Sequence, residues 1–298
     1  MSVNVGMALV QAYKSNIEIG FQQRGSRLRS TVRNETQNSE FDFYDRITST
    51  AAVEITDRHG DTPLISTPHD RRRVTLRSYE WADLIDRPDR IRMLADPTSP
   101  YAENAIYALG RTMDSLIISE ATGTAYTGKT GGTTQTHPTT SQIAVGYSET
   151  SGTSPDSNLT IGKLRRARFL FDSNEAVMDG EELFFVLKAS QVQSLLRTTE
   201  VTSSDYNSVK ALVAGEVDTF MGFRFIRTEL LSTDANNVTT CLAYPRSAIT
   251  LAVGADLDVD IGPRRDKRNS TQVYVSATFG ATRMWEEKVL SIACDDDL

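Results

Sequence analysis

The order of apolar and polar positions changes from a strand pattern to a helix pattern and back along the chain. In residues 51–84, β-branched and aromatic residues stand on either side of Gly60, Pro63 and Pro68, which predicts a long β-hairpin. Residues 34–50 are polar with scattered aromatic residues and show no clear period.

One long amphipathic helix is predicted from Pro100 to Thr122. Ser99 suits the N-cap, and proline suits the first helical position because its missing N–H has no partner there. Gly123 suits a left-handed C-cap. Apolar residues recur at helical spacing between these ends, at Ile106, Leu109, Met113, Leu116 and Ile117.

From Thr160 the pattern becomes that of a compact α/β region. Thr160 suits the N-cap of a helix that runs to about Asp172. The further predicted elements are a buried strand at Leu183–Leu187, short helices at Ala189–Arg197 and Tyr206–Val213, and a strand within Gly215–Leu231.

The last fifty residues have a strand pattern. DLDVDIG, QVYVSATFGATRMW and KVLSIAC are predicted strands, and GPRRDKRNS between the first two is a predicted turn or loop. These strands must pair with one another or with an early part of the chain. The final Asp295, Asp296 and Asp297 are expected to form a solvated end.

Residues 123–130, GTAYTGKT, match the phosphate-binding pattern GxxxxGK(S/T). That loop functions only between a buried strand and a following helix. Here a predicted helix precedes the match, and GGTTQTHPTTSQ does not favour a helix after it. Because Gly, Ser and Thr fill 21 of the 35 positions from 123 to 157, a chance match is easy. A nucleoside-triphosphatase that uses Lys129 is therefore a less favoured alternative.

The composition is that of an ordinary globular protein, with 39% hydrophobic and 24% charged residues. The net charge of −7 disfavours a dedicated nucleic-acid binder. The N-terminus lacks a signal-peptide pattern, and no apolar run approaches the roughly 18 residues of a membrane span. Cys241 and Cys294 lack CxxC spacing and are expected to be partly buried thiols in a reducing compartment.

Arginine dominates the basic residues, with 25 Arg against 7 Lys. Guanidinium groups make planar, bidentate contacts with carboxylates, so the bias fits a large protein–protein contact area, although the genome's nucleotide composition would also explain much of it. The first 33 residues contain one acidic residue, Glu18, against five basic ones. This basic arm lies near a polyanion or is a solvated tail.

The predicted hairpin region is also charged, with eight Arg against seven Asp or Glu from Asp57 to Arg92. Such an element either lies across a neighbouring molecule or forms a solvated surface. The sequence predicts no catalytic, cofactor or metal site, because no GxSxG motif is present and the histidines lack zinc-ligand spacing. The three histidines are His59, His69 and His137.

Four segments together resemble the major capsid proteins of tailed bacteriophages, which share the Hong Kong 97-like fold. Along the chain they read GDTPLISTPHDRRRVTLRSYEWADLID, DPTSPYAENAIYALGRTMDSLI, GEVDTFMGFRFIRTELL and VYVSATFGATRMWEEKVLSI. The resemblance covers nearly the whole chain and implies an α+β fold that forms a virion shell. An encapsulin-type protein compartment, which shares this fold, is the alternative.

The resemblance implies a division of the chain into four parts. These are an N-terminal arm (1–44), an extended β-hairpin loop (45–86), a peripheral domain (87–156 and 250–298) with a spine helix at 100–122, and an axial domain (157–249). Some relatives cross-link their subunits through a lysine of the extended loop. Residues 45–86 contain no lysine, so a non-covalent shell is predicted.

The resemblance also implies the partners. The chain is expected to assemble with itself into pentamers and hexamers in the bacterial host cytoplasm. The shell is expected to enclose double-stranded DNA and to contact it weakly and non-specifically. A portal protein and a separate scaffolding protein are expected, a decoration protein is allowed, and no membrane is involved. The predicted contacts between subunits are Asp57, Arg58, Asp61, Asp70, Arg71, Arg72, Arg73 and Arg77, and the residues predicted near DNA are Arg24, Arg27, Arg29 and Arg33.

Overall fold

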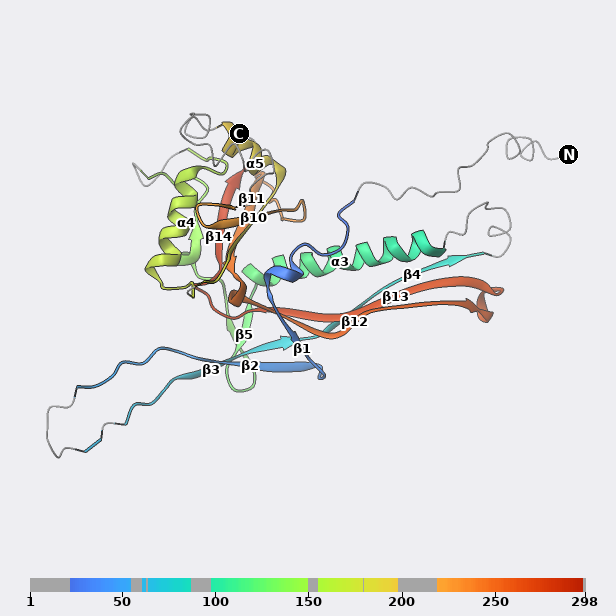
Figure 1. The fold of residues 1–298 in the computed structure, drawn as a ribbon, viewed down its shortest axis with the longest axis horizontal. Coiled ribbons are helices and arrows are strands. Elements are labelled where there is room, and N and C mark those ends of the chain that lie inside the picture. The colour runs from blue at the N-terminus through green and yellow to red at the C-terminus, as the bar shows by residue number, and fades with distance from the viewer. Residues whose placement is uncertain are drawn as a thin grey trace. The chain divides into compact units, whose positions relative to one another are not determined.

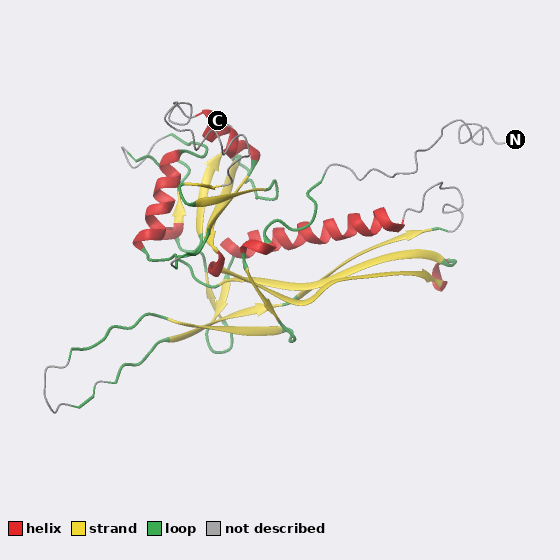
Figure 2. Ribbon diagram, viewed as in Figure 1, coloured by secondary structure: helices red, strands yellow, loops and turns green. Residues whose placement is uncertain are grey.

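The computed structural model describes residues 22–54, 61–62, 64–86, 98–149, 155–178, 180–197 and 219–296. Helices and strands are both well represented, so the described part of the chain is α+β (Figures 1 and 2). The described residues divide into two compact units. The first contains residues 22–26, 78–86, 98–112 and 255–278, and the second contains the remainder.

Parts of three neighbouring strands and the start of a long helix form the first unit, and residues 77, 249–254 and 279–283 of these strands belong to the second unit. The strands follow the order β12-β13-β4, with β4 at Arg77–Ile85, β12 at Ile249–Arg264 and β13 at Ser270–Arg283. The helix is α3, which spans Thr98–Thr122 and continues into the second unit. Val273, Val275 and Ala277 alternate along β13 and are buried, as expected for a strand with one covered face.

A six-stranded mixed sheet forms the centre of the second unit, and α4 (Ile161–Ser173) lies alongside it (Figure 2). β8 is buried at every position because it lies between β11 and β10 inside the sheet. Aromatic rings of Phe171, Phe185 and Phe223 join α4 to the sheet, with ring centroids 5.8–6.2 Å apart. The sheet order is β7 (Gln142–Ile143), β14 (Leu290–Asp295), β11 (Val238–Pro245), β8 (Leu183–Leu187), β10 (Phe223–Arg227) and β9 (Thr219–Phe220).

The second unit also holds an antiparallel sheet of four strands, β2-β3-β5-β6. Its long ladder pairs β2 (Phe41–Ile47) with β3 (His69–Thr75) and leads into an extended loop (Figure 1). β5 (Ala125–Thr127) and β6 (Thr133–Gln135) complete the sheet. Separately, β1 (Arg33–Thr36) runs parallel to β12 and pairs with Thr250–Val253.

The prediction of a hairpin over residues 51–84 was wrong in its strands. The N-terminal strand is Phe41–Ile47, whereas residues 51–54 form no strand and 55–60 lie outside the described residues. Residues 77–85 belong to β4, which neighbours β13. The pattern failed because Phe41–Ile47 has no buried face within its own chain, so no apolar alternation marks it.

Most predicted elements are confirmed. α3 ends at Thr122 as predicted, but it begins at Thr98, so the predicted N-cap Ser99 lies inside the helix, and Gly123 lacks the positive φ of a left-handed C-cap. The Thr160 hydroxyl caps α4 by accepting a hydrogen bond from the Lys163 amide at 3.3 Å. Helix α5 spans Ala189–Arg197, and the predicted helix at Tyr206–Val213 lies outside the described residues. No helix of the described residues is long and apolar enough to cross a membrane.

The expectation of a solvated C-terminal end was wrong for Asp296. Its carboxylate accepts hydrogen bonds from Ser190 Oγ at 3.1 Å, from Thr239 Oγ1 at 2.6 Å and from the Gln191 amide group. Asp296 therefore connects the start of α5 to β11 in the second unit. Asp297 lies outside the described residues.

Candidate assembly surfaces

A group of exposed apolar residues of the second unit lies on β2 and on the loop between β2 and β3. The Leu64 side chain is 96% exposed, which places almost all of its apolar surface in water. Covering such a residue contributes about 1.5–3 kcal/mol, so this loop is a candidate for burial against another molecule. The exposed apolar residues here are Phe41, Ile47, Val53, Leu64 and Ile65.

A buried ion pair anchors the base of this β2–β3 hairpin. Arg72 on β3 is completely buried, and its guanidinium Nη2 donates to Glu286 Oε1. The same side chain donates from Nε to the Met284 carbonyl at 3.4 Å. Because residues 284–286 follow β13, the hairpin is attached to a segment more than 200 residues later in the sequence.

Arg46 on β2 extends this charged cluster to a second carboxylate. Its Nη2 donates to Asp70 Oδ2 at 2.6 Å, and its Nη1 donates to Glu286 Oε2 at 3.2 Å. Burial alone would raise the pKa of Asp70. Hydrogen bonds from the Thr127 hydroxyl, from Arg46 and from the Arg71 amide outweigh burial and lower that pKa to about 2. Asp70 is therefore ionised at neutral pH and is protonated only in strong acid.

Arg283 connects the cluster to the end of α3. Its buried Nη1 donates to the carbonyls of Ala121 and Gly123, both at 2.8 Å, and its Nε lies 3.8 Å from Glu286 Oε1. A cation at a helix C-terminus stabilises the unpaired carbonyls and the negative end of the helix dipole. Glu286 thus receives three arginines, Arg46, Arg72 and Arg283, and holds the hairpin, β13 and the helix end together.

The N-terminal segment is fixed to α3 within each unit. In the first unit, Arg111 Nη1 donates to Gln22 Oε1 at 2.6 Å, and a Cβ built on Gly110 would lie 2.6 Å from the Gly25 carbonyl carbon. In the second unit, the Asp114 carboxylate accepts the amides of Arg27 and Leu28 at 2.9 and 3.2 Å. Only a residue without a side chain allows the approach at Gly110.

The structure divides the predicted subunit contacts into internal and accessible groups. Arg72 was expected to contact a neighbour, but its guanidinium forms an ion pair with Glu286 of the same chain. Asp70 forms an ion pair with Arg46. Both are used internally because the base of the hairpin needs paired charges when it is buried. Arg73 lies over the Tyr126 ring at 4.8 Å.

Two of the predicted arginines remain well exposed. Arg71 is 3.0 Å from Asp45 with its side chain 40% exposed, and Arg77 is 3.8 Å from Glu120 with its side chain 62% exposed. Asp61 is exposed, whereas Asp57 and Arg58 lie outside the described residues.

The predicted DNA-proximal arginines are mostly accessible but have different local partners. Arg24 is exposed, and Arg33 is 2.6 Å from Glu35. The Arg27 guanidinium donates to the Arg227 carbonyl, and Arg29 is half-buried.

The segment that resembles a phosphate loop has another structure. After α3, the Gly123 amide donates to the Ser119 carbonyl at 2.9 Å, and β5 and β6 then form a short hairpin. Lys129 is exposed in the turn of that hairpin, and Gly128 has a φ of +88°. No helix follows Lys129 before residue 139, so the prediction that this match lacks a phosphate-binding context is confirmed.

No group of three or more His, Cys, Asp or Glu residues that could hold a metal ion occurs among the described residues. Cys241 and Cys294 are buried free thiols. Sequence reasoning missed Glu286, Arg283 and Arg46, because each is an ordinary charged residue and only the fold brings the three together.

The described elements, which include the long helix α3, long strands and an extended hairpin, have the same fold as several solved structures. Solved structures with this fold include the capsid of Ralstonia phage GP4 (12% identity, 96% of this chain and 95% of that chain, TM-score 0.73). The head of Helicobacter pylori bacteriophage KHP40 gives 10% identity, 99% and 98% coverage and a TM-score of 0.72. A structure from Mycobacterium phage Che8 has 12% identity and a TM-score of 0.69, and the match covers 95% of this chain and 97% of that chain. A search of curated proteins finds no match.

The family model described as phage capsid protein matches residues 5–296. The chain therefore belongs to the phage capsid protein family, and the predicted Hong Kong 97-like fold is confirmed. It is a major capsid protein of the virion shell, not an enzyme, and neither the encapsulin nor the nucleoside-triphosphatase alternative is favoured.

Proposed function

We propose that this subunit forms pentamers and hexamers of a non-covalent icosahedral shell around double-stranded DNA. The observation that carries the proposal is the hairpin, whose apolar loop residue Leu64 is almost fully exposed while its base is fixed by buried ion pairs. A rigid base with an uncovered apolar loop suits an element that packs on an identical neighbour. Contacts between unlike faces of identical chains close into rings.

The four-part division into arm (1–44), extended loop (45–86), peripheral domain and axial domain is part of this proposal. Arg71 and Arg77 are the proposed contacts with carboxylates of a neighbour, because both are exposed and lie near the hairpin base. Each exposed ion pair contributes only about 0.2–1 kcal/mol, so they act as a set.

The absence of lysine from residues 45–86 supports a shell without cross-links through this loop. Denaturing electrophoresis of boiled mature particles is expected to give one band near 33 kDa. A ladder of covalent multimers that persists in denaturant would contradict the non-covalent shell.

The proposed partners are double-stranded DNA, a portal protein and a separate scaffolding protein, with a decoration protein allowed, and assembly takes place in the host cytoplasm. Arg24 is exposed, so its positive charge is available to neutralise a DNA phosphate, which supports a weak, salt-sensitive contact between the arm and DNA. Replacing Arg24 by Gln should lower the salt concentration at which opened particles release DNA. An unchanged salt dependence would remove the arm from the DNA contact.

Electron microscopy combined with the ratio of absorbance at nucleic-acid and protein wavelengths tests the main proposal. Particles from a phage lysate should be icosahedral shells that contain nucleic acid. Closed shells filled with protein cargo would instead favour a compartment of the encapsulin type. Small rings whose ATP hydrolysis is lost in Lys129→Ala would favour the nucleoside-triphosphatase.

A further inference from the structure

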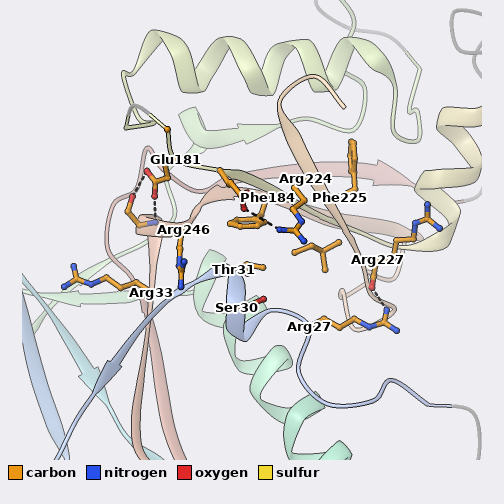
Figure 3. A pocket seen from close by; sticks show the side chains of 14 residues that line it. Arg27, Ser30, Thr31, Arg33, Glu181, Phe184, Arg224, Phe225, Arg227 and Arg246 are labelled. Carbon is orange, nitrogen blue, oxygen red and sulfur yellow. Dashed lines mark hydrogen bonds and ion pairs between the residues drawn. The ribbon is translucent and has the colours of Figure 1, made fainter. Parts of the chain in front are cut away.

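An arginine-lined cleft of about 1020 Å³ lies in the second unit (Figure 3). One wall is the segment from Arg27 to Arg33, and the other consists of β8, β10 and the short helix Arg246–Ala248. Five arginines and two glutamates line it, so the charges of the lining side chains sum to +3, although Arg33 is also paired with Glu35 outside the lining. The arginines are Arg27, Arg33, Arg224, Arg227 and Arg246, and the glutamates are Glu181 and Glu182.

The carboxylates near the cleft do not neutralise all of its arginines. Glu182 is 3.5 Å from Arg224, and Glu181 accepts hydrogen bonds from the Ser247 amide and hydroxyl at 2.6 and 3.2 Å. Arg246 is exposed and has neither an ion pair nor a side-chain hydrogen bond within the described residues. Figure 3 shows its side chain projecting into the cleft. The cleft therefore offers a guanidinium that lacks a carboxylate partner.

The rest of the lining favours a protein carboxylate over a nucleic-acid phosphate. Phe184, Phe225 and Ile226 provide apolar wall, which suits a peptide with apolar and acidic side chains. Glu181 and Glu182 would repel the closely spaced charges of a phosphate backbone. Arginine binds carboxylates with paired, planar hydrogen bonds, which gives an acidic protein segment a specific geometry here.

The same chain carries a matching row of carboxylates on β12, in the first unit. Asp256, Asp258 and Asp260 are exposed and alternate along the strand, so they lie on one face about 6.6 Å apart. Asp258 and Asp260 have no ion pair or hydrogen bond with any described side chain. Leu257, Val259 and Ile261 form an exposed apolar row on the opposite face.

This part of β12 is accessible along its backbone as well. β1 pairs with β12 only at Thr250–Val253, and no other described strand lies on that side of Ala255–Arg264. A row of aspartates on an open edge discourages pairing between two copies of the same strand, because like charges would then face each other. The edge is suited to a basic partner instead.

We infer that the arginine-lined cleft of one copy binds the aspartate row of β12 from a second copy, with Arg246 paired to Asp258 or Asp260. The inference rests on the proposed shell, in which identical chains surround each subunit. The contact joins two different faces of the chain, and such heterologous contacts propagate around a ring. Closure of the ring leaves neither the cleft nor the aspartate row uncovered.

A charge-swap experiment in the phage tests this contact. Arg246→Glu and Asp258→Arg are each introduced alone and then together, and particles in the lysate are quantified by gradient sedimentation and electron microscopy. Lys129→Glu replaces a cation by an anion, as Arg246→Glu does, but in an exposed turn, and it serves as the control. Each single variant should lower particle yield by at least about tenfold, because a close interfacial ion pair couples at that level or above. The combined variant should return the yield to within about threefold of the parent chain.

Three results would overturn the inference. The first is a particle yield of both single variants equal to that of Lys129→Glu, and the second is a combined variant no better than its parents. The third is unchanged assembly of Arg246→Glu with altered salt dependence of DNA release, which would assign the cleft to phosphate. Thermal melting of each unassembled variant separates a folding defect from an assembly defect. Normal shells from the parent chain keep the proposed function independent of these outcomes.

Discussion

Replacing Glu286 by Gln should destabilise the second unit strongly and loosen the hairpin. Arg72 and Arg283 are both completely buried, and the Glu286 side chain is only 10% exposed, so the carboxylate neutralises charges that water cannot reach. Removing one partner of such a buried pair costs about 3–5 kcal/mol, because the remaining charge stays desolvated. Gln preserves the shape of the side chain, so the loss comes from charge and not from a cavity.

The assay is thermal unfolding of the unassembled chain, followed by calorimetry. With roughly 2–4 °C per kcal/mol in chains of 150–250 residues, the melting temperature should fall by roughly 6–20 °C. Glu287→Gln is the matched control, because the neighbouring side chain is exposed and should leave the melting temperature within about 1 °C. Protease cleavage between residues 48 and 68 should also become faster in Glu286→Gln. If Glu286→Gln and Glu287→Gln have the same melting temperature, the buried cluster does not hold the hairpin and this reasoning is refuted.

Three further predictions concern the pH dependence, the arm and the C-terminal end. Because the pKa of Asp70 is lowered to about 2, its contribution to stability is complete above about pH 4 and is lost as the pH falls towards 2. Acid titration of the melting temperature should therefore flatten in this window in Asp70→Asn. Gly110→Ala should displace residues 22–26, because the new Cβ would lie 2.6 Å from the Gly25 carbonyl carbon. Gly262→Ala is the control, because a Cβ there meets nothing within 4 Å. Equal rates of hydrogen exchange at residues 22–26 in the two variants would contradict the displacement. Asp296→Ala should cost about 1–3 kcal/mol in urea unfolding by leaving buried donors unpaired, and an unchanged midpoint would restore the idea of a solvated end.

The helical and buried strand elements were predictable because their apolar residues follow the period of the element. α3 has an apolar row at helical spacing and a glycine directly after its end, and β8 is a short run of apolar residues. β2 could not be predicted in this way. Its residues are half-exposed on both faces, and its partner strand begins 22 residues after it ends. The hydrogen bonds that pair Phe41–Ile47 with His69–Thr75 join residues far apart in the sequence, and no local pattern of apolar residues indicates them.

The charged cluster could not be predicted for a related reason. Arg46, Asp70, Arg72, Arg283 and Glu286 lie up to 240 residues apart, and nothing in their neighbours distinguishes them from solvated residues. Only pairing across β2, β3 and the segment after β13 brings them within hydrogen-bond distance. The phosphate-loop match was resolved correctly from the sequence, because its meaning depends on the adjacent elements and these were predictable.

The structure changes the interpretation of the arginine-rich composition. The 25 arginines against 7 lysines suggested an extensive contact surface, yet Arg46, Arg72 and Arg283 act inside the subunit. Guanidinium suits this role because it keeps its charge when buried and can donate to a carboxylate and to backbone carbonyls at once, whereas a buried lysine tends to lose its proton. These three arginines join the hairpin, the segment after β13 and the end of α3 through the single carboxylate of Glu286. Part of the arginine content therefore fixes the hairpin within its own subunit and does not belong to a contact surface.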